Sequence, residues 1–283
     1  MLCHRQTFDN RLALRLDRRV NTWLAIRFVL LHVAALAVFF VPFTPALLGW
    51  LGVSYVIRMF GVTAGYHRYF SHRSYKLGRV AQFVMAVLAQ TSGQKGVLWW
   101  AAHHRDHHRH ADRPEDVHSP RHGWWWSHAG WILSTERDHY EPARVADFGR
   151  YPELRWLDRH HWVPLAGFGL AVLAIGGVAA FAWGFLLATV ALYHATFAIN
   201  SVAHIWGTRP FATADDSRNN LLLALITLGE GWHNNHHHCR SSCRQGVEWW
   251  QVDATYLMLR ALAAVGIARD LRPFVVRQER IAA

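Results

Sequence analysis

Histidines at metal-ligand spacing, threaded between long apolar segments, constrain this chain more than any other feature of its sequence. They comprise one spaced pair, two H-x-x-H-H clusters and one isolated residue: His67, His72, His104, His107, His108, His204, His233, His236 and His237. A neutral imidazole offers one ring nitrogen to iron, copper or zinc. Nine such ligands are too many for one ion, so the pattern predicts a membrane-embedded enzyme with two metal ions.

Four apolar segments predict an all-α integral membrane protein. The chain of 283 residues is 52% hydrophobic, and each segment approaches the roughly 20 residues that span a bilayer core. The predicted spans are residues 23–41, 45–66, 163–181 and 184–206. They pair into two hairpins, with outer turns near Pro42 to Pro45 and around Trp183 and Gly184.

The charges of the connecting segments predict the orientation. Neither outer turn contains Lys or Arg, whereas residues 1–22 hold five Arg and the regions 67–162 and 207–283 are rich in both. The positive-inside rule therefore places both termini in the cytoplasm, with a bacterial-type inner membrane expected. The two basic regions then form one cytoplasmic helical cap that holds the metal site, and residues 1–283 form a single domain.

The N-terminus and the cysteines add little. Residues 5–22 are either an amphipathic surface helix or an ordinary solvated leader, and no cleavable signal peptide is expected. The cysteines Cys3, Cys239 and Cys243 give no disulfide framework. We treat Cys239 and Cys243 as incidental, because the adjacent histidines already suffice as ligands.

The strong positive charge indicates a lipid partner. The formal net charge is +11, but the basic residues are spread along loops next to apolar spans rather than gathered in a nucleic-acid recognition element. The bilayer, its anionic headgroups or an anionic acyl carrier explain this charge better. No nucleic-acid partner is expected.

Two further helices are expected in the cap. Residues 76–100 are apolar but interrupted by polar side chains, which predicts an interfacial or reentrant helix. A fifth span there would carry the second histidine cluster to the far side from the first. Residues 248–268 show helical periodicity.

The spacing within the clusters predicts how they converge. On a helix, positions i, i+3 and i+4 share one face, so His104, His107 and His108 point together, and the last cluster repeats the arrangement. His67 and His72 would lie about 140° apart on a continuous helix. We therefore predict that the second span ends or distorts between them, near Ser71.

Polar side chains inside the fourth span are expected to be functional, because unpaired polar groups are costly there. Asn200 and His204 share a face, so we assign His204 as a ligand and Asn200 as holding a metal-bound water. His194 is expected to make a helix–helix hydrogen bond rather than to support a ligand. His103 and His238 could donate hydrogen bonds to the ligands.

These motifs resemble those of the membrane fatty acyl desaturases of the acyl-CoA desaturase type. Residues 61–76 (GVTAGYHRYFSHRSYK) resemble that family's first histidine box, and His104 to His108, with Asp116, His118 and residues 127–131 (SHAGW), resemble the second. Residues 194–204 and 229–237 (GEGWHNNHH) complete the pattern. The resemblance runs from about residue 23 to residue 260.

The resemblance implies a four-span fold and a di-iron centre held by the nine histidines, with a water held through Asn200. It also implies the reaction, in which O2 and two external electrons remove two hydrogens from a saturated acyl chain, giving a cis double bond, at Δ9 of an acyl-CoA by preference. All-imidazole ligation would leave the irons cationic and reactive towards oxygen, and an apolar tunnel would hold the chain.

The substrate residues are predicted less directly. Animal members of the family carry Trp-Ala-Arg-Asp where this chain has Trp100 to His103, so acyl carrier protein or a membrane lipid remains open beside coenzyme A. Tyr55 could close the far end of the tunnel or simply pack. The other predicted substrate contacts are Gln94, Trp100 and Phe197, with Arg68, Arg73, Lys76, Lys95 and Arg121 for the headgroup.

Two rival functions stay open. A membrane fatty acid hydroxylase or alkane monooxygenase also uses clustered histidines and iron, although such enzymes usually begin with an H-x3-H pair. A metal transporter would need ionisable groups through the spans, which are largely apolar. The chain shows no haem-binding or dinucleotide-binding motif, so a ferredoxin, rubredoxin or cytochrome with its reductase is expected to supply electrons.

Overall fold

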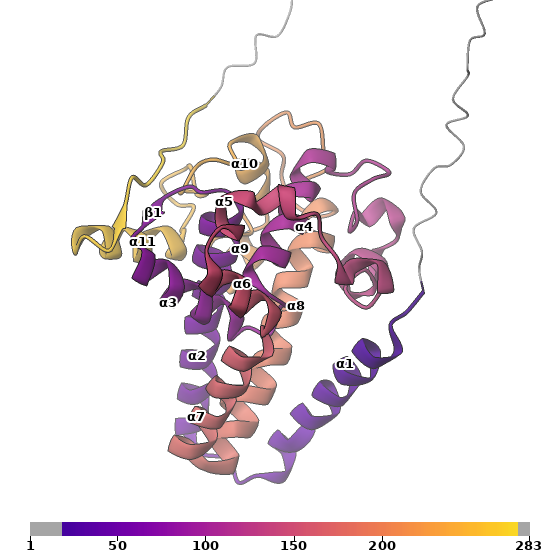
Figure 1. Cartoon of the computed structure of the whole chain (residues 1–283), viewed down its shortest axis with the longest axis vertical. Helices are drawn as coiled ribbons and strands as arrows, with labels where there is room; N and C mark the ends of the chain where they lie inside the picture. The colour runs from indigo at the N-terminus through magenta and orange to yellow at the C-terminus, as the bar shows by residue number, and fades with distance from the viewer. Residues whose placement is uncertain (1–18, 277–283) are drawn as a thin grey trace, which may run out of the picture.

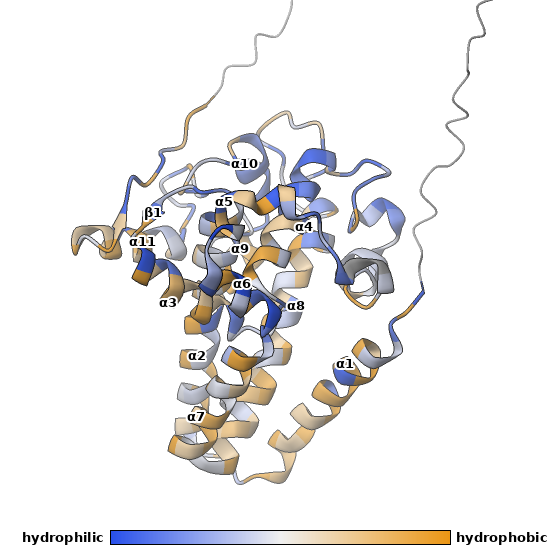
Figure 2. Cartoon of the chain, in the orientation of Figure 1, coloured by the Kyte–Doolittle hydropathy of each residue, from blue (hydrophilic) through white to orange (hydrophobic). Residues whose placement is uncertain are grey.

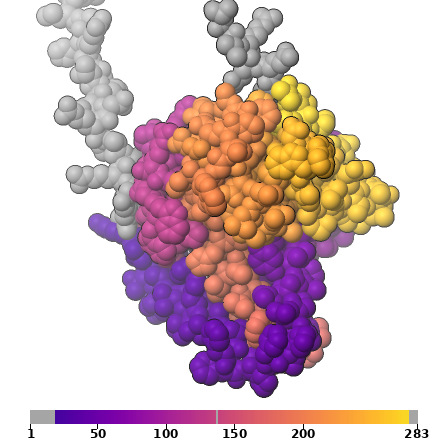
Figure 3. All heavy atoms as spheres, turned by 180° about the vertical axis from the view of Figure 1, so that it is seen from behind, coloured from indigo at the N-terminus to yellow at the C-terminus, as the bar shows by residue number. Residues whose placement is uncertain are grey.

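The computed structural model describes residues 19–276, apart from the side chains of residues 136 and 137. The described part is mostly helical and consists of long apolar helices below a polar head, which we define as residues 72–161 and 205–276 (Figure 1). Hydrophobic residues dominate the helices, and hydrophilic residues are concentrated in the head (Figure 2). From behind, the head segments form one continuous mass above the helices (Figure 3).

Three helical stretches are long and apolar enough to cross a membrane: Thr22–Phe40, Pro45–Ser71 and Trp162–His204. The first comprises α1 (Thr22–Ala35) and η1 (Leu36–Phe40), and the second α2 (Pro45–Phe60) and η2 (Gly61–Ser71). The third comprises α7 (Trp162–Ala180), η7 (Phe181–Leu187), α8 (Ala188–Ser201) and η8 (Val202–His204). The lower end of α1 meets the other helices, and its upper part diverges from them (Figure 1).

The third stretch folds back on itself. Gly177 has a φ of 71°, a left-handed conformation that glycine adopts without steric cost. The rings of Phe168 and Phe185 lie 6.4 Å apart, although a straight helix would separate these residues by about 26 Å. The reversal therefore lies at Gly177, and the turn expected around Trp183 and Gly184 is helical instead.

A π-helical segment brings the side chains of His67 and His72 to the same side of the second apolar stretch. Residues Gly61–Ser71 form a π-helix, in which hydrogen bonds join residues five apart. The His72 N–H donates to the His67 carbonyl at 3.2 Å, and the two rings lie 4.8 Å apart. The predicted distortion is confirmed, but it extends over 11 residues rather than a single break at Ser71.

The head is built from short helices and one small sheet. Its helices are α3 (Arg79–Gln90), α4 (Val97–His110), η3 (Pro120–His122), η4 (Trp126–Gly130), η5 (Thr135–Asp138), η6 (Pro142–Val145), α5 (Ala146–Gly149), α6 (Pro152–Arg159), α9 (Leu221–Ile226), α10 (His233–His238) and α11 (Ala254–Ala264). Strands β1 (Lys76–Leu77) and β2 (Ala268–Arg269) pair antiparallel, with Lys76 opposite Arg269. Helix α11 falls within the stretch whose periodicity predicts a helix.

Helix α3 occupies the stretch expected to be interfacial or reentrant. Its 12 residues extend about 18 Å, well short of the roughly 30 Å core of a bilayer. The predicted surface helix at 5–22 falls mostly outside the described residues. Within them, Val20 forms a β-bridge with Ser134, and α1 begins at Thr22.

Candidate metal centre and adjoining cavity

Helix α4 carries the central histidine cluster, and its start is fixed by a neighbouring helix. Asp158 of α6 accepts the backbone N–H groups of Leu98 and Trp99, at 2.9 and 3.0 Å. Gly96 allows this close approach, because a Cβ there would lie 2.0 Å from the Asp158 Oδ1 atom. The carboxylate therefore satisfies N–H groups that a helix start leaves unpaired.

The structure brings all nine predicted histidines together in two adjoining groups. The first contains His67, His72, His104, His108 and His236, and the second contains His107, His204, His233 and His237. Within each group the possible ligand atoms lie within 4.8 Å of one another. The groups touch, because the rings of His108 and His237 are 4.5 Å apart.

The spacing of the ring nitrogens fits shared metal ions. Four Nε2–Nε2 distances in the first group measure 2.8–3.0 Å, and the Nε2 atoms of His204 and His233 lie 3.0 Å apart. Two nitrogens about 2.1 Å from one ion, at a right angle, would be about 3.0 Å apart. In the second group the buried Nε2 atom of His237 has no hydrogen-bond partner among the described residues, and an ion would satisfy it.

Carboxylates orient four of the nine rings from behind. Asp112 accepts the Nδ1–H of His204 at 2.8 Å, Asp116 that of His107 at 3.0 Å, and Asp215 that of His237 at 2.9 Å. Glu230 pairs with Nδ1 of His67. A proton on Nδ1 leaves the Nε2 lone pair of the same ring available to a metal ion, as in many metal sites.

The electrostatics of the site keep these protonation states in place. Burial lowers the pKa of several imidazoles well below the usual 6.5, so they are neutral at pH 7: His104, His108, His233 and His236. Burial alone would raise the pKa of Asp112, but the hydrogen bond and charge of His204 lower it. Neutral rings backed by ionised carboxylates are the donor set that a divalent cation prefers.

Sequence reasoning missed these carboxylates as orienting groups. Asp116 and Glu230 lie within the quoted motifs, but Asp112 is 92 positions from His204 and Asp215 is 22 positions from His237. A left-handed φ of 57° at Asp112 is unusual outside glycine, but it cannot be read from the sequence.

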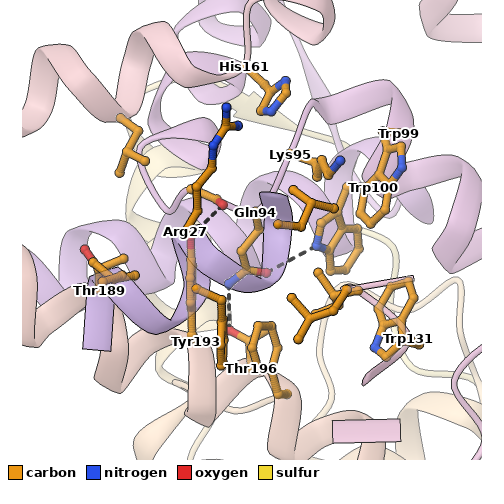
Figure 4. A pocket seen from close by; sticks show the side chains of 18 of the residues that line it. Arg27, Gln94, Lys95, Trp99, Trp100, Trp131, His161, Thr189, Tyr193 and Thr196 are labelled. Atoms are coloured by element: carbon orange, nitrogen blue, oxygen red, sulfur yellow. Dashed lines mark hydrogen bonds between the residues drawn. The ribbon is translucent and has the colours of Figure 1, made fainter. Parts of the chain in front are cut away.

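A mainly apolar cavity of about 400 Å³ adjoins the first histidine group and reaches His104 (Figure 4). The lining also includes Asn200, which precedes His204 by four residues. Residues of η7 and α8 line the cavity, from Phe185 through Tyr193 to Phe197. Helix α1 and the start of α7 supply other walls.

Three predicted substrate contacts line this cavity: Gln94, Trp100 and Phe197. The Gln94 side chain donates to Thr196 Oγ1 at 3.0 Å, and the Trp100 indole N–H points to its carbonyl oxygen at 3.4 Å. Trp100 also stacks on His104, with ring centroids 4.9 Å apart. A polar bridge thus crosses the cavity wall beside a candidate ligand.

The predicted cationic contacts divide sharply. Lys95 lines the cavity. Arg68 is 1% exposed and pairs with Glu230 and Asp253, so its expected headgroup role is wrong because its charge is used inside the protein. The exposed Arg73, Lys76 and Arg121 pair with Asp147, Asp270 and Asp216, respectively, and do not belong to the described lining.

Tyr55 does not close this cavity. Its hydroxyl donates to the carbonyl of Ile226 at 2.7 Å, and its ring lines a separate hollow with His194 and Leu225. The expectation that its ring ends the tunnel is wrong for the cavity described here. The described wall contains Phe185 and Thr189 instead.

His194 makes the helix–helix hydrogen bond that its position predicts. Its Nε2 lies 2.9 Å from Nε2 of His32 on α1, and its Nδ1 lies 2.9 Å from Nε2 of His128. His128 in turn contacts the Ser201 hydroxyl at 2.9 Å. These residues tie α1 to α8 and to η4.

Fold and site together define a helical protein that presents two histidine groups beside an apolar cavity. A family model described as fatty acid desaturase matches residues 44–270. The chain is 38% identical over 214 residues to the probable lipid desaturase ADS3.2, chloroplastic, of Arabidopsis thaliana, covering 75% of this chain and 59% of that protein. It therefore spans somewhat more than half the length of that relative.

Two other relatives are covered more fully. The chain is 34% identical over 255 residues to the icosanoyl-CoA 5-desaturase of Limnanthes douglasii, covering 88% of this chain and 71% of that protein. It is 32% identical over 260 residues to the sn-1 stearoyl-lipid 9-desaturase of Anabaena variabilis, covering 89% and 93%. The chain belongs to the fatty acid desaturase family and is an oxidoreductase.

Proposed function

We propose that this protein introduces a cis double bond into a saturated acyl chain, using O2 and two external electrons. The observation that carries the proposal is the mainly apolar cavity lined in part by His104 and Asn200, where a C–H pair could lie beside the histidine groups. The balance is one O2, two electrons and two protons, with two hydrogens from the acyl chain, giving the alkene and two water molecules.

The chain's own residues would position and shield the substrate. Apolar side chains would exclude water from the cavity, and hydrogen bonds to Thr196 and Trp100 hold the Gln94 side chain at its wall. A fixed wall at this point would hold one C–H pair in register with the metal site. Proximity of this kind, rather than a separate acid or base, is the protein's main contribution.

The nine histidines would hold two ferrous ions, one in each group, and Asn200 would hold a metal-bound water. Bound iron would accept the external electrons and supply the oxygen-activating chemistry that side chains lack. The orienting carboxylates Asp112, Asp116, Asp215 and Glu230 would hold the Nδ1 protons and keep each Nε2 free.

A four-span arrangement is supported by the reversal at Gly177, which divides the third apolar stretch into two antiparallel parts. With the positive-inside rule, the head and both termini would be cytoplasmic in an inner membrane of bacterial type. An external ferredoxin, rubredoxin or cytochrome would donate electrons there. Δ9 is the proposed position, and the names of the relatives include both a lipid and a coenzyme A carrier.

Gas chromatography–mass spectrometry of derivatised lipids from expressing cells tests this proposal. Wild type should produce new monounsaturated chains, and a His107→Ala/His233→Ala variant should not. The matched control is His139→Ala, because His139 is exposed and lies in neither group. Hydroxylated chains in place of alkenes would refute desaturation in favour of hydroxylation.

A further inference from the structure

A group of basic side chains lies where the cavity meets a second hollow. The second hollow has a volume of about 480 Å³ and shares four lining residues with the cavity, among them Arg27, Lys95 and His161. These three come from α1, the α3–α4 connection and the residue before α7, and they lie on one side of the cavity (Figure 4). We call Arg27, Lys95 and His161 the mouth cluster.

The mouth cluster contains two cationic side chains, Arg27 and Lys95, beside the imidazole of His161. Lys95 pairs with Asp138 at 2.7 Å, whereas no ion pair joins Arg27 to a carboxylate among the side chains that the structure describes. Burial and the charge of Lys95 lower the pKa of His161, against the opposing effect of Asp158, so His161 is a neutral hydrogen-bonding group here. The two cations and the imidazole line the same hollow, so they could act together on an anion.

The backbone at Lys95 is held in an unfavourable conformation. Its φ is 69°, in the left-handed region that residues with a Cβ rarely adopt. The Tyr66 hydroxyl fixes this turn by donating to the Lys95 carbonyl at 2.6 Å. Such strain persists where the surrounding structure enforces it, and it is concentrated at functional sites.

The mouth cluster lies where lipid headgroups would meet the protein. Arg27 is in the second turn of the apolar helix α1, about 8 Å from its start. Trp23 and Trp162 flank the opening and are 72% and 61% exposed, as expected for side chains at a membrane–water interface. A soluble thioester would instead need its phosphates recognised at a water-facing surface.

We propose that Arg27, Lys95 and His161 bind the phosphate of a membrane phospholipid whose acyl chain enters the adjoining cavity. This inference rests on the proposed function, and it specifies the carrier as a glycerophospholipid rather than coenzyme A. The lipid would enter between α1 and the start of α7, because both helices line the cavity. Arginine recognises phosphate through several N–H groups at once.

Native mass spectrometry of the purified iron-loaded full chain, without oxygen or reductant, measures this binding. The probes are dipalmitoyl phosphatidylglycerol, dipalmitoyl monogalactosylglycerol, which has no phosphate, and palmitoyl-CoA. We expect the phospholipid to bind at least tenfold more tightly than the galactolipid. Arg27→Gln and Lys95→Gln should each weaken phospholipid binding about tenfold, while Arg27→Lys should retain most of it.

The galactolipid and a distant variant provide the controls. Galactolipid affinity should change less than twofold in each mouth variant, which separates lost recognition from misfolding. Arg79→Gln removes an exposed cation that pairs with Glu153 and should change neither affinity. Equal affinities for the two lipids, or equal losses in a mouth variant, would overturn the phosphate site.

Palmitoyl-CoA distinguishes the two sources of phosphate. Binding of palmitoyl-CoA that depends on Arg27, with no binding of the phospholipid, would overturn the lipid carrier. Adding reductant and O2 then tests the proposed function separately. A bound phospholipid that gains no double bond would support the lipid site and refute desaturation. If Arg27→Gln and Lys95→Gln instead bind the phospholipid as wild type does and still form product, the site alone would be refuted.

Discussion

Replacing Asp112 by Asn should weaken one metal site without unfolding the protein. The Asp112 carboxylate accepts three hydrogen bonds, from His204 Nδ1 at 2.8 Å, the Ser119 hydroxyl at 2.7 Å and the Asp216 N–H at 2.8 Å. The first and third share one oxygen, which Asn can supply, and the Ser119 hydroxyl can turn to accept from the new amide. Asn also tolerates the left-handed φ of 57°.

The main effect of Asp112→Asn is therefore to remove the negative charge beside Nδ1 of His204. Removing such an orienting partner typically lowers metal affinity 10- to 100-fold, or about 1.4–2.7 kcal/mol. We would titrate the ferrous protein with a chelator and measure retained iron by mass spectrometry. One of two irons should leave at a chelator concentration about 10- to 100-fold lower than in wild type.

The matched control is Asp270→Asn, because Asp270 also has a left-handed φ, of 54°, but forms an exposed pair with Lys76. It should retain iron as wild type does. If Asp112→Asn also kept both irons at wild-type affinity, the assignment of His204 as a ligand held by Asp112 would be refuted.

Three further predictions concern the stability of variants at polar residues. Asp158→Ala should lower the free energy of unfolding by about 1–2 kcal/mol in thermal unfolding, because two N–H groups at the start of α4 lose their acceptor. Asp158→Asn keeps an acceptor oxygen and should be destabilised less. Equal destabilisation of the two variants would contradict the capping role of Asp158. Arg68→Met should lower the free energy of unfolding by about 3–5 kcal/mol, because it removes the cation that pairs with two buried carboxylates, Glu230 and Asp253. Arg73→Met at the surface should change the unfolding midpoint little. Burial and, to a smaller extent, the charge of His194 lower the pKa of His128 to about 4. Between about pH 6.5 and pH 4 this imidazole therefore binds a proton more readily in the unfolded chain than in the folded protein. Stability should therefore fall as pH drops from about 6.5 to about 4, and His128→Gln should flatten that slope in pH-dependent thermal unfolding.

The sequence predicts the histidine groups well because helical spacing is a local property. His104, His107 and His108 share a face on any α-helix, and the structure places them as expected. The conflict at His67 and His72 also predicts a distortion. Its form, a π-helix over Gly61–Ser71, depends on packing against α3 and α4 and cannot be derived from one segment alone.

Contacts between distant segments were not predictable in the same way. Arg68 reads as a basic residue beside a membrane helix, yet Glu230 and Asp253, more than 150 positions away, bury it as an ion pair. Tyr55 has the right distance from His67 for a tunnel end, but α9 supplies a carbonyl that holds it elsewhere. Arg27 lies within a predicted span, 68 positions before Lys95, and only the fold shows that the two residues line the same hollow.

A single-turnover experiment tests the central claim that two histidine-bound irons desaturate an acyl chain. The purified protein, loaded with iron and a saturated lipid, is reduced anaerobically, freed of reductant and exposed to O2, and iron and alkene are counted in the same sample. Two irons per chain and close to one double bond per chain are predicted, because two ferrous ions store the two electrons needed. A single iron, bound zinc with full activity, or a hydroxylated chain in place of the alkene would contradict the account.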